Sequence, residues 1–380
     1  MIDPIYLDYN ATTPVAPQVL DALLPWLREQ FGNPSSTHPF GRRAAQAVAV
    51  ARQQVADLIG AQPREIVFTG CATEANNLAL LGAASALGTT KRHLVVSAVE
   101  HPAVMAPAML LREQGWQVTV LPVDTFGRVS LDQFAAALRP DTALVSVMHA
   151  NNEVGTLQPV REIARLTRER GVLLHTDAAQ SAGKVPLDVN DLGVELLTLA
   201  GHKFHAPKGV GALYVRAGTP IRSVLHGAEQ EHGLRPGTEN VAAIVALGAA
   251  AALAADSLGS VPAHMRALRD HLHEQLATAI PGLQLNGHPE HRLPNTLHVS
   301  FPGVSGRSLL SEAAAVVAAS VGSACHSEHD AVSGVLAAMG ADAARAAGAV
   351  RLSVGRTTTS EEIERAARGL IIAWQRLRTR

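Results

Sequence analysis

Short apolar runs alternate with helical patterns along residues 60–220, and this alternation limits the possible folds more than any other feature. The apolar runs have the length of buried strands, and the stretches between them have the spacing of helices. Such β-α-β alternation predicts an α/β fold with a mostly parallel sheet and helices on both faces. The strands are expected at 65–69, 93–97, 118–121, 143–148, 172–175, 196–199 and 212–215, and helices at 72–84, 104–114, 131–138 and 160–170.

The pattern changes after about residue 255, which indicates a second, smaller α+β domain. Its expected elements are a charged helix at 263–279, strands at 283–285, 296–300 and 350–354, and a closing helix at 360–377. Ser360 is the expected start of that helix, and Ile363 leaves its capping box incomplete. We therefore predict a large domain over residues 16–254 and a small domain made of residues 1–15 and 255–380.

Charge and composition argue against several classes of protein. The formal net charge is −1, so no overall field favours nucleic acid or an anionic membrane. The apolar run Val241–Ala255 is shorter than the roughly 20 residues that span a bilayer, and predicts a buried alanine-rich helix. Two cysteines, Cys71 and Cys325, cannot build a disulfide framework, and the N-terminus lacks the pattern of a secretory signal. We expect a cytoplasmic protein.

Lys203 follows the predicted strand 196–199, at the edge of the sheet where α/β folds bind ligands. Lysine occurs at only four positions, Lys91, Lys184, Lys203 and Lys208, so a lysine within a motif is informative. Its amine can form a Schiff base with a carbonyl if burial lowers its pKa. The alternative is an ordinary surface lysine after a strand.

Asp177 and Gln180 follow the preceding predicted strand, 172–175. An acid at this edge can keep the ring nitrogen of a pyridine cofactor protonated, and the amide can bind the ring's phenolate oxygen. The alternative is an aspartate that caps a helix.

The turn after strand 65–69 leads directly into a helix, and its backbone N–H groups can bind a phosphate with Ala72 and Thr73. The turn lacks the glycine patterns of nucleotide-binding loops, and an ordinary helix start is the alternative. Cys71 within it is expected to be a small packed thiol. His101, after strand 93–97, can stack on a ring and move protons, although a lone histidine is usually structural.

Three further segments carry polar or reactive groups. Asn152 lies in an amide-rich turn, and Arg351 can bind an α-carboxylate in a bidentate manner or form a structural ion pair. Cys325 lies in a small, glycine-containing segment from which a thiol can reach a substrate and withdraw. The neighbouring His326 and His329 do not make a zinc site, because ligands this close in one segment cannot surround a metal tetrahedrally.

In their order along the chain, these motifs resemble the cysteine desulfurases of the NifS/IscS-like group, class V aminotransferases within the fold-type I pyridoxal phosphate enzymes. Each motif is weak alone, and the ordered set covers nearly the whole chain. The matching segments are Tyr6-Leu7-Asp8-Tyr9-Asn10-Ala11-Thr12-Thr13-Pro14, Ala72-Thr73-Glu74-Ala75-Asn76-Asn77, Asn151-Asn152-Glu153, Asp177-Ala178-Ala179-Gln180, Gly201-His202-Lys203, Arg235-Pro236-Gly237-Thr238-Glu239-Asn240 and Gly322-Ser323-Ala324-Cys325.

The resemblance implies a homodimer that converts L-cysteine to L-alanine with pyridoxal 5′-phosphate, leaves a persulfide on Cys325, and passes the sulfur to an acceptor or scaffold protein, as in iron–sulfur cluster assembly. Lys203 would carry the cofactor and move protons, with His101 stacked on the ring as an acid/base. The remaining implied cofactor contacts are Ala72, Thr73, Asn152, Asp177, Gln180, His202 and the partner subunit's Thr238, and the implied substrate contacts are Asn10, Asn152 and Arg351.

Some positions depart from the family pattern. Ala200 stands where a serine often binds the phosphate, and Glu229 replaces a glycine near the expected entrance. The apolar residue before Gly201-His202-Lys203 and the segments 235–240, 293–296 and 324–329 resemble selenocysteine lyase, a relative that also releases alanine. A selenocysteine lyase and, less favoured, a class V aminotransferase that would not need Cys325 are therefore the alternatives. A scaffold without enzymatic activity is disfavoured by the complete set of chemical residues.

Overall fold

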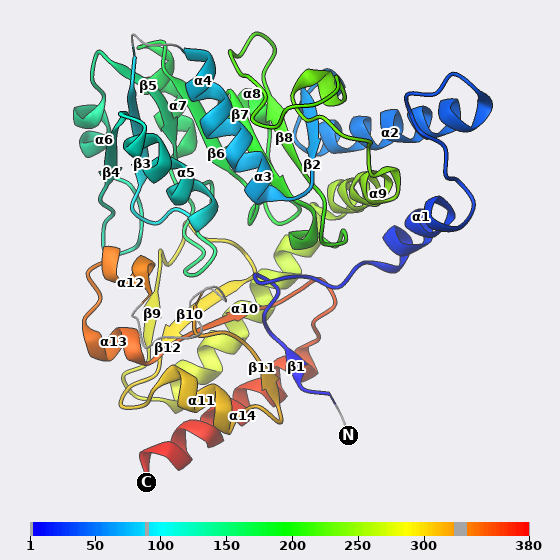
Figure 1. The fold of residues 1–380 in the computed structure, drawn as a ribbon. Coiled ribbons are helices and arrows are strands. Elements are labelled where there is room, and N and C mark those ends of the chain that lie inside the picture. The colour runs from blue at the N-terminus through cyan, green and yellow to red at the C-terminus, as the bar shows by residue number, and fades with distance from the viewer. Residues whose placement is uncertain (1–2, 88–90, 323–332, 380) are drawn as a thin grey trace.

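The computed structural model describes residues 3–87, 91–322 and 333–379. Its larger sheet has seven strands in the order β2-β8-β7-β6-β5-β3-β4, and β8 alone runs antiparallel to its neighbours (Figure 1). The mostly parallel sheet is thus confirmed. Its strands are β2 (Ile66–Thr69), β3 (His93–Ser97), β4 (Gln117–Leu121), β5 (Thr142–Ser146), β6 (Leu173–Asp177), β7 (Leu196–Ala200) and β8 (Gly211–Val215).

Helices cover both faces of this sheet. Successive residues of a strand point to opposite sides and so enter two different cores. Val95 belongs to the core beneath one set of helices, whereas Leu94 and Val96 belong to the core on the other face. The helices around the sheet are α1 (Pro17–Arg28), α2 (Pro39–Leu58), α3 (Ala72–Asn77), α4 (Ala83–Leu87), α5 (Pro102–Glu113), α6 (Leu131–Ala137), α7 (Val160–Arg168), α8 (Val189–Leu192) and α9 (Val241–Ser257).

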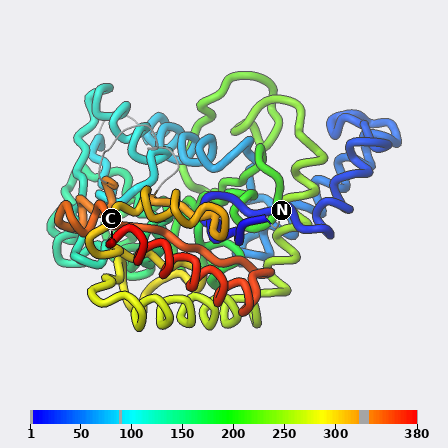
Figure 2. Tube along the Cα trace, turned by 90° about the horizontal axis from the view of Figure 1, so that it is seen from below, coloured from blue at the N-terminus to red at the C-terminus, as the bar shows by residue number. Residues whose placement is uncertain are grey.

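A second, antiparallel sheet has the order β12-β10-β9. Helices α10 and α14 lie side by side beneath it (Figure 2), and Ile5 and Leu7 of the N-terminal segment belong to the same core. The boundaries predicted at residues 15/16 and 254/255 stay predictions. The elements of this part are β1 (Ile5–Tyr6), α10 (Val261–Ala279), β9 (Gln284–Asn286), β10 (Thr296–Ser300), α11 (Gly306–Glu312), β11 (Val317–Ala318), α12 (Gly334–Ala338), α13 (Ala343–Ala347), β12 (Ala349–Ser353) and α14 (Ser360–Arg378).

The helix expected at 72–84 is present and continues to Leu87, with a π turn over Leu78–Gly82 between α3 and α4. The carbonyl of Gly82 accepts a hydrogen bond from the Arg222 N–H outside the helix. One local expectation was wrong. The last helix has a complete capping box, because its N-cap is Thr359 rather than Ser360 and Glu362 therefore takes the closing position.

The alanine-rich segment expected to form a buried helix does so as α9. Among the described helices, none is by itself long and apolar enough to cross a bilayer; α9 and α10 reach that length and composition only together, across a bend of 74°.

Candidate active site

A cavity lies at the carboxyl ends of the parallel strands, where the N-terminal segment and β12 approach the larger sheet. It encloses about 950 Å³ of empty space and is open to solvent. Its lining residues are Asn10, Ala11, Cys71, Ala72, Thr73, Asn76, His101, Ala103, Met148, Ala150, Asn152, Asp177, Ala179, Gln180, Ala200, His202, Lys203 and Arg351.

Asp177 is the last residue of β6 and is only 6% exposed. One carboxylate oxygen accepts the Asn76 amide Nδ2–H at 2.7 Å, and the other accepts the Ala179 N–H at 2.9 Å. The Asn76 side-chain oxygen is buried without a partner within the described residues. The sequence analysis missed this role of Asn76, although the residue stands in the quoted motif of α3. A fixed, buried carboxylate can hold a cationic ring nitrogen.

Lys203 ends the short turn Gly201–Lys203 that follows β7. Its ammonium donates to the backbone oxygens of Asn10 and Ala11, at 2.5 and 2.8 Å. These two carbonyls, from the far end of the sequence, hold the amine at the cavity. The adjacent His202 ring contacts the Thr12 hydroxyl at 3.1 Å, and burial, with Lys203 nearby, lowers its pKa to about 4. His202 is therefore neutral at pH 7.

His101 is the N-cap of α5, and its Nδ1 accepts the backbone N–H of Ala103 at 3.1 Å. Burial lowers its pKa, with Lys203 adding to the effect and Asp177 opposing it. Since Nδ1 is the acceptor, the hydrogen bond assigns the proton of the neutral imidazole to Nε2. His101 can thus donate a hydrogen bond to a ligand in the cavity it lines.

The turn between β2 and α3 brings Cys71, Ala72 and Thr73 to the cavity. Its shape is held by Glu74, which accepts the Gly70 N–H at 2.9 Å and pairs with Arg235 at 2.8 Å. The expectation of a packed Cys71 thiol is wrong, because Cys71 is exposed. It occupies the N-cap position of α3 with extended backbone, which directs it to the cavity rather than to the core.

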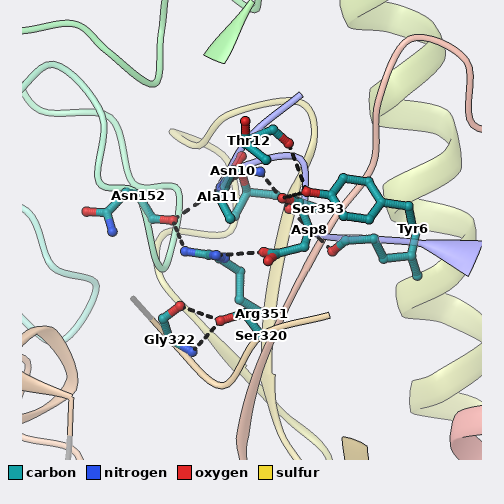
Figure 3. A network of polar contacts seen from close by, with 12 residues as sticks. Tyr6, Asp8, Asn10, Ala11, Thr12, Asn152, Ser320, Gly322, Arg351 and Ser353 are labelled. Carbon is teal, nitrogen blue, oxygen red and sulfur yellow. Dashed lines mark hydrogen bonds and ion pairs between the residues drawn. The ribbon is translucent and has the colours of Figure 1, made fainter. Parts of the chain in front are cut away.

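Arg351 of β12 reaches the opposite side of the cavity and is 2% exposed. Its guanidinium pairs with Asp8 at 2.7 Å and donates to the Asn152 backbone oxygen at 3.0 Å (Figure 3). The Arg351 backbone also pairs with Ser320, two residues before Gly322. The two roles predicted for Arg351, binding a carboxylate and forming a structural ion pair, are therefore compatible, because its side chain is in an ion pair and also lines the cavity.

Asn10 is 1% exposed, and protein groups use the full hydrogen-bonding capacity of its side chain. Its Nδ2 donates to the Asn152 backbone oxygen and the Thr296 hydroxyl, at 3.2 and 2.8 Å. Its Oδ1 accepts from Asn295 and Lys184, at 3.0 and 3.3 Å. These contacts favour a positioning role for Asn10 over the predicted direct contact with substrate.

The structure brings together ten of the predicted site residues around this one cavity: Asn10, Ala72, Thr73, His101, Asn152, Asp177, Gln180, His202, Lys203 and Arg351. Thr238 is exposed and does not line it. Cys325 lies outside the described residues. No group of three or more metal-ligating side chains occurs within the described ranges.

Comparisons with known proteins identify the group to which this geometry corresponds. The family model "Aminotransferase class-V" matches residues 5–366. The chain is 44% identical to "Cysteine desulfurase IscS" of Dictyoglomus turgidum, over 94% of this chain and 91% of that protein. It is 48% identical to "Cysteine desulfurase 2" of Trichormus variabilis, over 95% and 90% of the two chains.

Solved structures agree. A "NIFS-LIKE PROTEIN" superposes with a TM-score of 0.91 at 38% identity and covers 99% of this chain and 100% of its own. A structure titled "SspA in complex with cysteine" superposes with a TM-score of 0.83 at 36% identity and covers 93% of this chain and 99% of its own.

Proposed function

Since the chain belongs to the aminotransferase class-V family, we propose that it is a pyridoxal phosphate-dependent cysteine desulfurase, which converts L-cysteine to L-alanine and transfers the sulfur through Cys325. One observation carries the proposal: Asp177, His101 and Lys203 meet in one cavity of a chain whose full-length relatives are named cysteine desulfurases. An acid for the ring nitrogen and an amine for the Schiff base are the groups that this cofactor requires, and the imidazole of His101 adds an acid/base beside them.

The residues present fit the cofactor. Asp177 is held in place by Asn76 and the Ala179 N–H, and the Asn76 oxygen stays without a partner among the described groups. Thr73 and the turn before α3 offer donors for a phosphate, with neutral His202 beside them. Ala200 supplies no hydroxyl there, so we assign the phosphate to Thr73, His202 and backbone N–H groups, completed by Thr238 of the partner subunit.

When bound, pyridoxal phosphate withdraws electrons from the substrate and makes its Cα–H acidic. We assign Lys203 the transfer of that proton, because its amine lies at the cavity against the carbonyls of Asn10 and Ala11. We assign Arg351 and Asn152 the substrate carboxylate, since a guanidinium fork binds carboxylates with fixed geometry.

Sulfur transfer requires a nucleophile, and we assign this role to Cys325. Its thiolate attacks the substrate sulfur and forms an S–S bond, while the Cβ–S bond breaks. The electron pair of that bond stays on carbon, which takes up protons to become alanine. We assign His101 the transfer of a proton at the sulfur, since its side chain lines the cavity and the Ala103 N–H occupies its Nδ1, which leaves Nε2 for this task.

We also infer a homodimer and a protein that accepts the persulfide sulfur. Thr238 does not line the cavity of its own chain, so its predicted phosphate contact requires a second copy. Sedimentation of the holoenzyme tests this inference: a dimer is expected, and a monomer with full activity would exclude the role of Thr238.

The function is tested by measuring alanine released from L-cysteine by the cofactor-loaded protein, beside Cys325→Ala and Cys71→Ala. Cys71→Ala is the matched control, because it removes the chain's other thiol, to which the proposal gives no role in sulfur transfer. Cys71 lies at the start of α3, away from Cys325 in the sequence. Alanine release is expected to be lost in Cys325→Ala and retained in Cys71→Ala. Mass spectrometry of the parent should locate the added sulfur on the peptide containing Cys325. Added sulfur only on Cys71 would contradict the proposal.

L-selenocysteine assayed in parallel tests the selenocysteine lyase alternative. Release of alanine from selenocysteine alone would establish the lyase. Transfer of the amino group to a keto acid, with no alanine from either substrate, would establish an aminotransferase.

A further inference from the structure

Lys184 is a buried lysine to which the reaction above gives no task. It is one of four lysines in the chain, and only 5% of it is exposed. It lies one helical turn's length beyond Gln180, in the turns that follow β6, and it shares a partner with Lys203: both amines contact Asn10, Lys184 at the side chain and Lys203 at the backbone. A fully buried amine needs a structural or functional reason, because burial of its charge is costly.

The amine of Lys184 donates to two amide oxygens. Its Nζ lies 2.9 Å from Gln180 Oε1 and 3.3 Å from Asn10 Oδ1. On its other side, the Gln180 amide donates one Nε2–H to the Asn10 backbone oxygen, at 3.0 Å. A backbone oxygen can only accept a hydrogen bond, so the nitrogen of the Gln180 amide must lie there.

These contacts fix which way the Gln180 amide points. With Oε1 held by Lys184 and one N–H held by Asn10, the second N–H is left for the cavity that Gln180 lines. Turning the amide over would place two oxygens, those of Asn10 and Gln180, against each other and would lose the contact to Lys184. Loss of such hydrogen bonds is unfavourable, the more so because the groups are buried.

We propose that Lys184 is a positioning residue, which holds the Gln180 amide so that it offers an N–H, and never its oxygen, to the phenolate oxygen of the bound cofactor. The inference rests on the proposed function, because it takes the cavity to hold pyridoxal phosphate. It assigns a task to Lys184 that neither the family resemblance nor the reaction requires.

The charges around Lys184 are consistent with action through hydrogen bonds. Burial, with the cations of Lys203 and Arg351 nearby, holds the pKa of Lys184 well below its usual value. Both the ammonium and the neutral amine have N–H groups enough for Gln180 and Asn10. The orientation of the Gln180 amide therefore does not depend on the charge of Lys184.

The test is a pH titration of the visible absorbance that the cofactor acquires on Lys203, in the parent and in Lys184→Met. A donor stabilises the anionic phenolate and so lowers the pKa of the chromophore. Loss of the positioned N–H should therefore raise that pKa, by about 0.5–1 unit for one hydrogen bond. Lys208→Met is the matched control, since Lys208 is an exposed lysine whose charge also acts on His202. It should leave the chromophore pKa unchanged.

A double-mutant cycle separates positioning from a general effect. In a Gln180→Ala background, Lys184→Met should produce no further shift, because the group through which Lys184 acts is gone. Equal shifts of the chromophore pKa with and without Gln180, or no shift in Lys184→Met, would overturn the inference. A parent protein that forms no chromophore would instead refute the proposed function.

Lys184→Arg keeps the inference testable if Lys184→Met does not fold. Arginine keeps N–H donors for the Gln180 and Asn10 side-chain oxygens. It should therefore keep the chromophore pKa of the parent. A folded Lys184→Arg enzyme whose chromophore pKa rises by about 0.5–1 unit would overturn the proposal.

Discussion

The two sides of the cavity are built in different ways. On the sheet side, Asp177 and Lys203 lie at or just after the ends of β6 and β7. Hydrogen bonds along neighbouring strands hold the backbone of Asp177 and of β7, the strand that leads to Lys203. On the rim, Asp8 and Arg351 meet across 343 residues of sequence, through side chains of the N-terminal segment and β12. The sheet side depends on a regular ladder, whereas the rim depends on individual polar contacts.

This difference separates the groups assigned to the cofactor from the groups assigned to the substrate carboxylate. Groups that must hold a cofactor in one place are on the sheet side, where the surrounding core is apolar and tightly packed. Groups assigned to the substrate carboxylate are on the rim, where Asp8 is partly exposed to solvent. We therefore expect substitutions on the sheet side to change the rate of alanine release more than substitutions on the rim.

The largest effect is expected for Lys203→Ala, which removes the amine from the sheet side. Loss of a positioned proton-transfer group typically costs about 10²–10⁴-fold, and alanine release from cysteine should fall by at least about 10³-fold. The visible absorbance of the bound cofactor should also change. Lys208→Ala, at an exposed position five residues further along the chain, is the control. A Lys203→Ala enzyme within tenfold of the parent rate would contradict the assignment.

The next effect is expected for Asp177→Asn, which keeps the shape of the carboxylate and removes its charge. An opposite charge within about 4–6 Å changes a partner's pKa by about 1–3 units, so loss of the charge beside the ring nitrogen should lower kcat by about 10²-fold. Asn76→Ala removes one hydrogen bond to that carboxylate and should cost about tenfold. The two kcat values, measured on cofactor-saturated enzyme, should keep this order; a larger loss in Asn76→Ala would refute it.

Acid should weaken the sheet side through its buried histidines. Burial lowers the pKa of His175 and of His149 to about 4, below the value of about 6.5 for an unfolded chain. Between these pH values the unfolded chain binds more protons, so stability present above pH 6.5 is lost as the pH falls towards 4. At pH 5 the loss is about 2 kcal/mol for each histidine.

Urea unfolding at pH 7.5 and pH 5 measures this loss. His175→Gln, which cannot titrate, should show a smaller difference in stability between the two pH values than the parent. Equal differences in the two proteins would mean that His175 binds protons equally in the folded and the unfolded state, and would contradict the prediction.

The smallest effect is expected on the rim, for Asp8→Asn. The Asp8–Arg351 pair is buried on its Arg351 side and partly exposed on its Asp8 side. Asp8→Asn keeps an oxygen that can accept from the guanidinium, so the change should cost less than leaving a buried charge without any partner. The KM for cysteine should rise by about threefold to fivefold with kcat nearly unchanged. Asp141→Asn breaks a more exposed ion pair, with Arg139, and should leave KM as it is. A fall in kcat equal to the rise in KM would place Asp8 in the chemistry rather than in positioning.

Local patterns predicted the strand ends well and the burial of Cys71 and the start of α14 less well. The strand ends carrying Asp177 and Lys203 followed from short apolar runs, which are local signals. The prediction that the Cys71 thiol is packed was wrong, because the burial of a turn residue depends on which other parts of the chain pack against it. The N-cap of α14 was misplaced by one residue, since Thr359 and Ser360 are both good caps and backbone geometry decided between them.

By itself, the sequence determined the parallel sheet, the order of its motifs and the set of polar groups at its carboxyl edge, because strand periodicity is local and parallel strands bring their ends together. Only the tertiary structure decided that Asn10 uses its whole side chain within the protein, that Asp8 pairs with Arg351, and that Lys184 holds Gln180. Asn10 and Asp8 join the N-terminal segment to β10 and β12, and no local pattern encodes these contacts, because they form only when distant parts of the chain pack together. Lys184 and Gln180 are only four residues apart, but their contact is completed by Asn10, which is distant in the sequence.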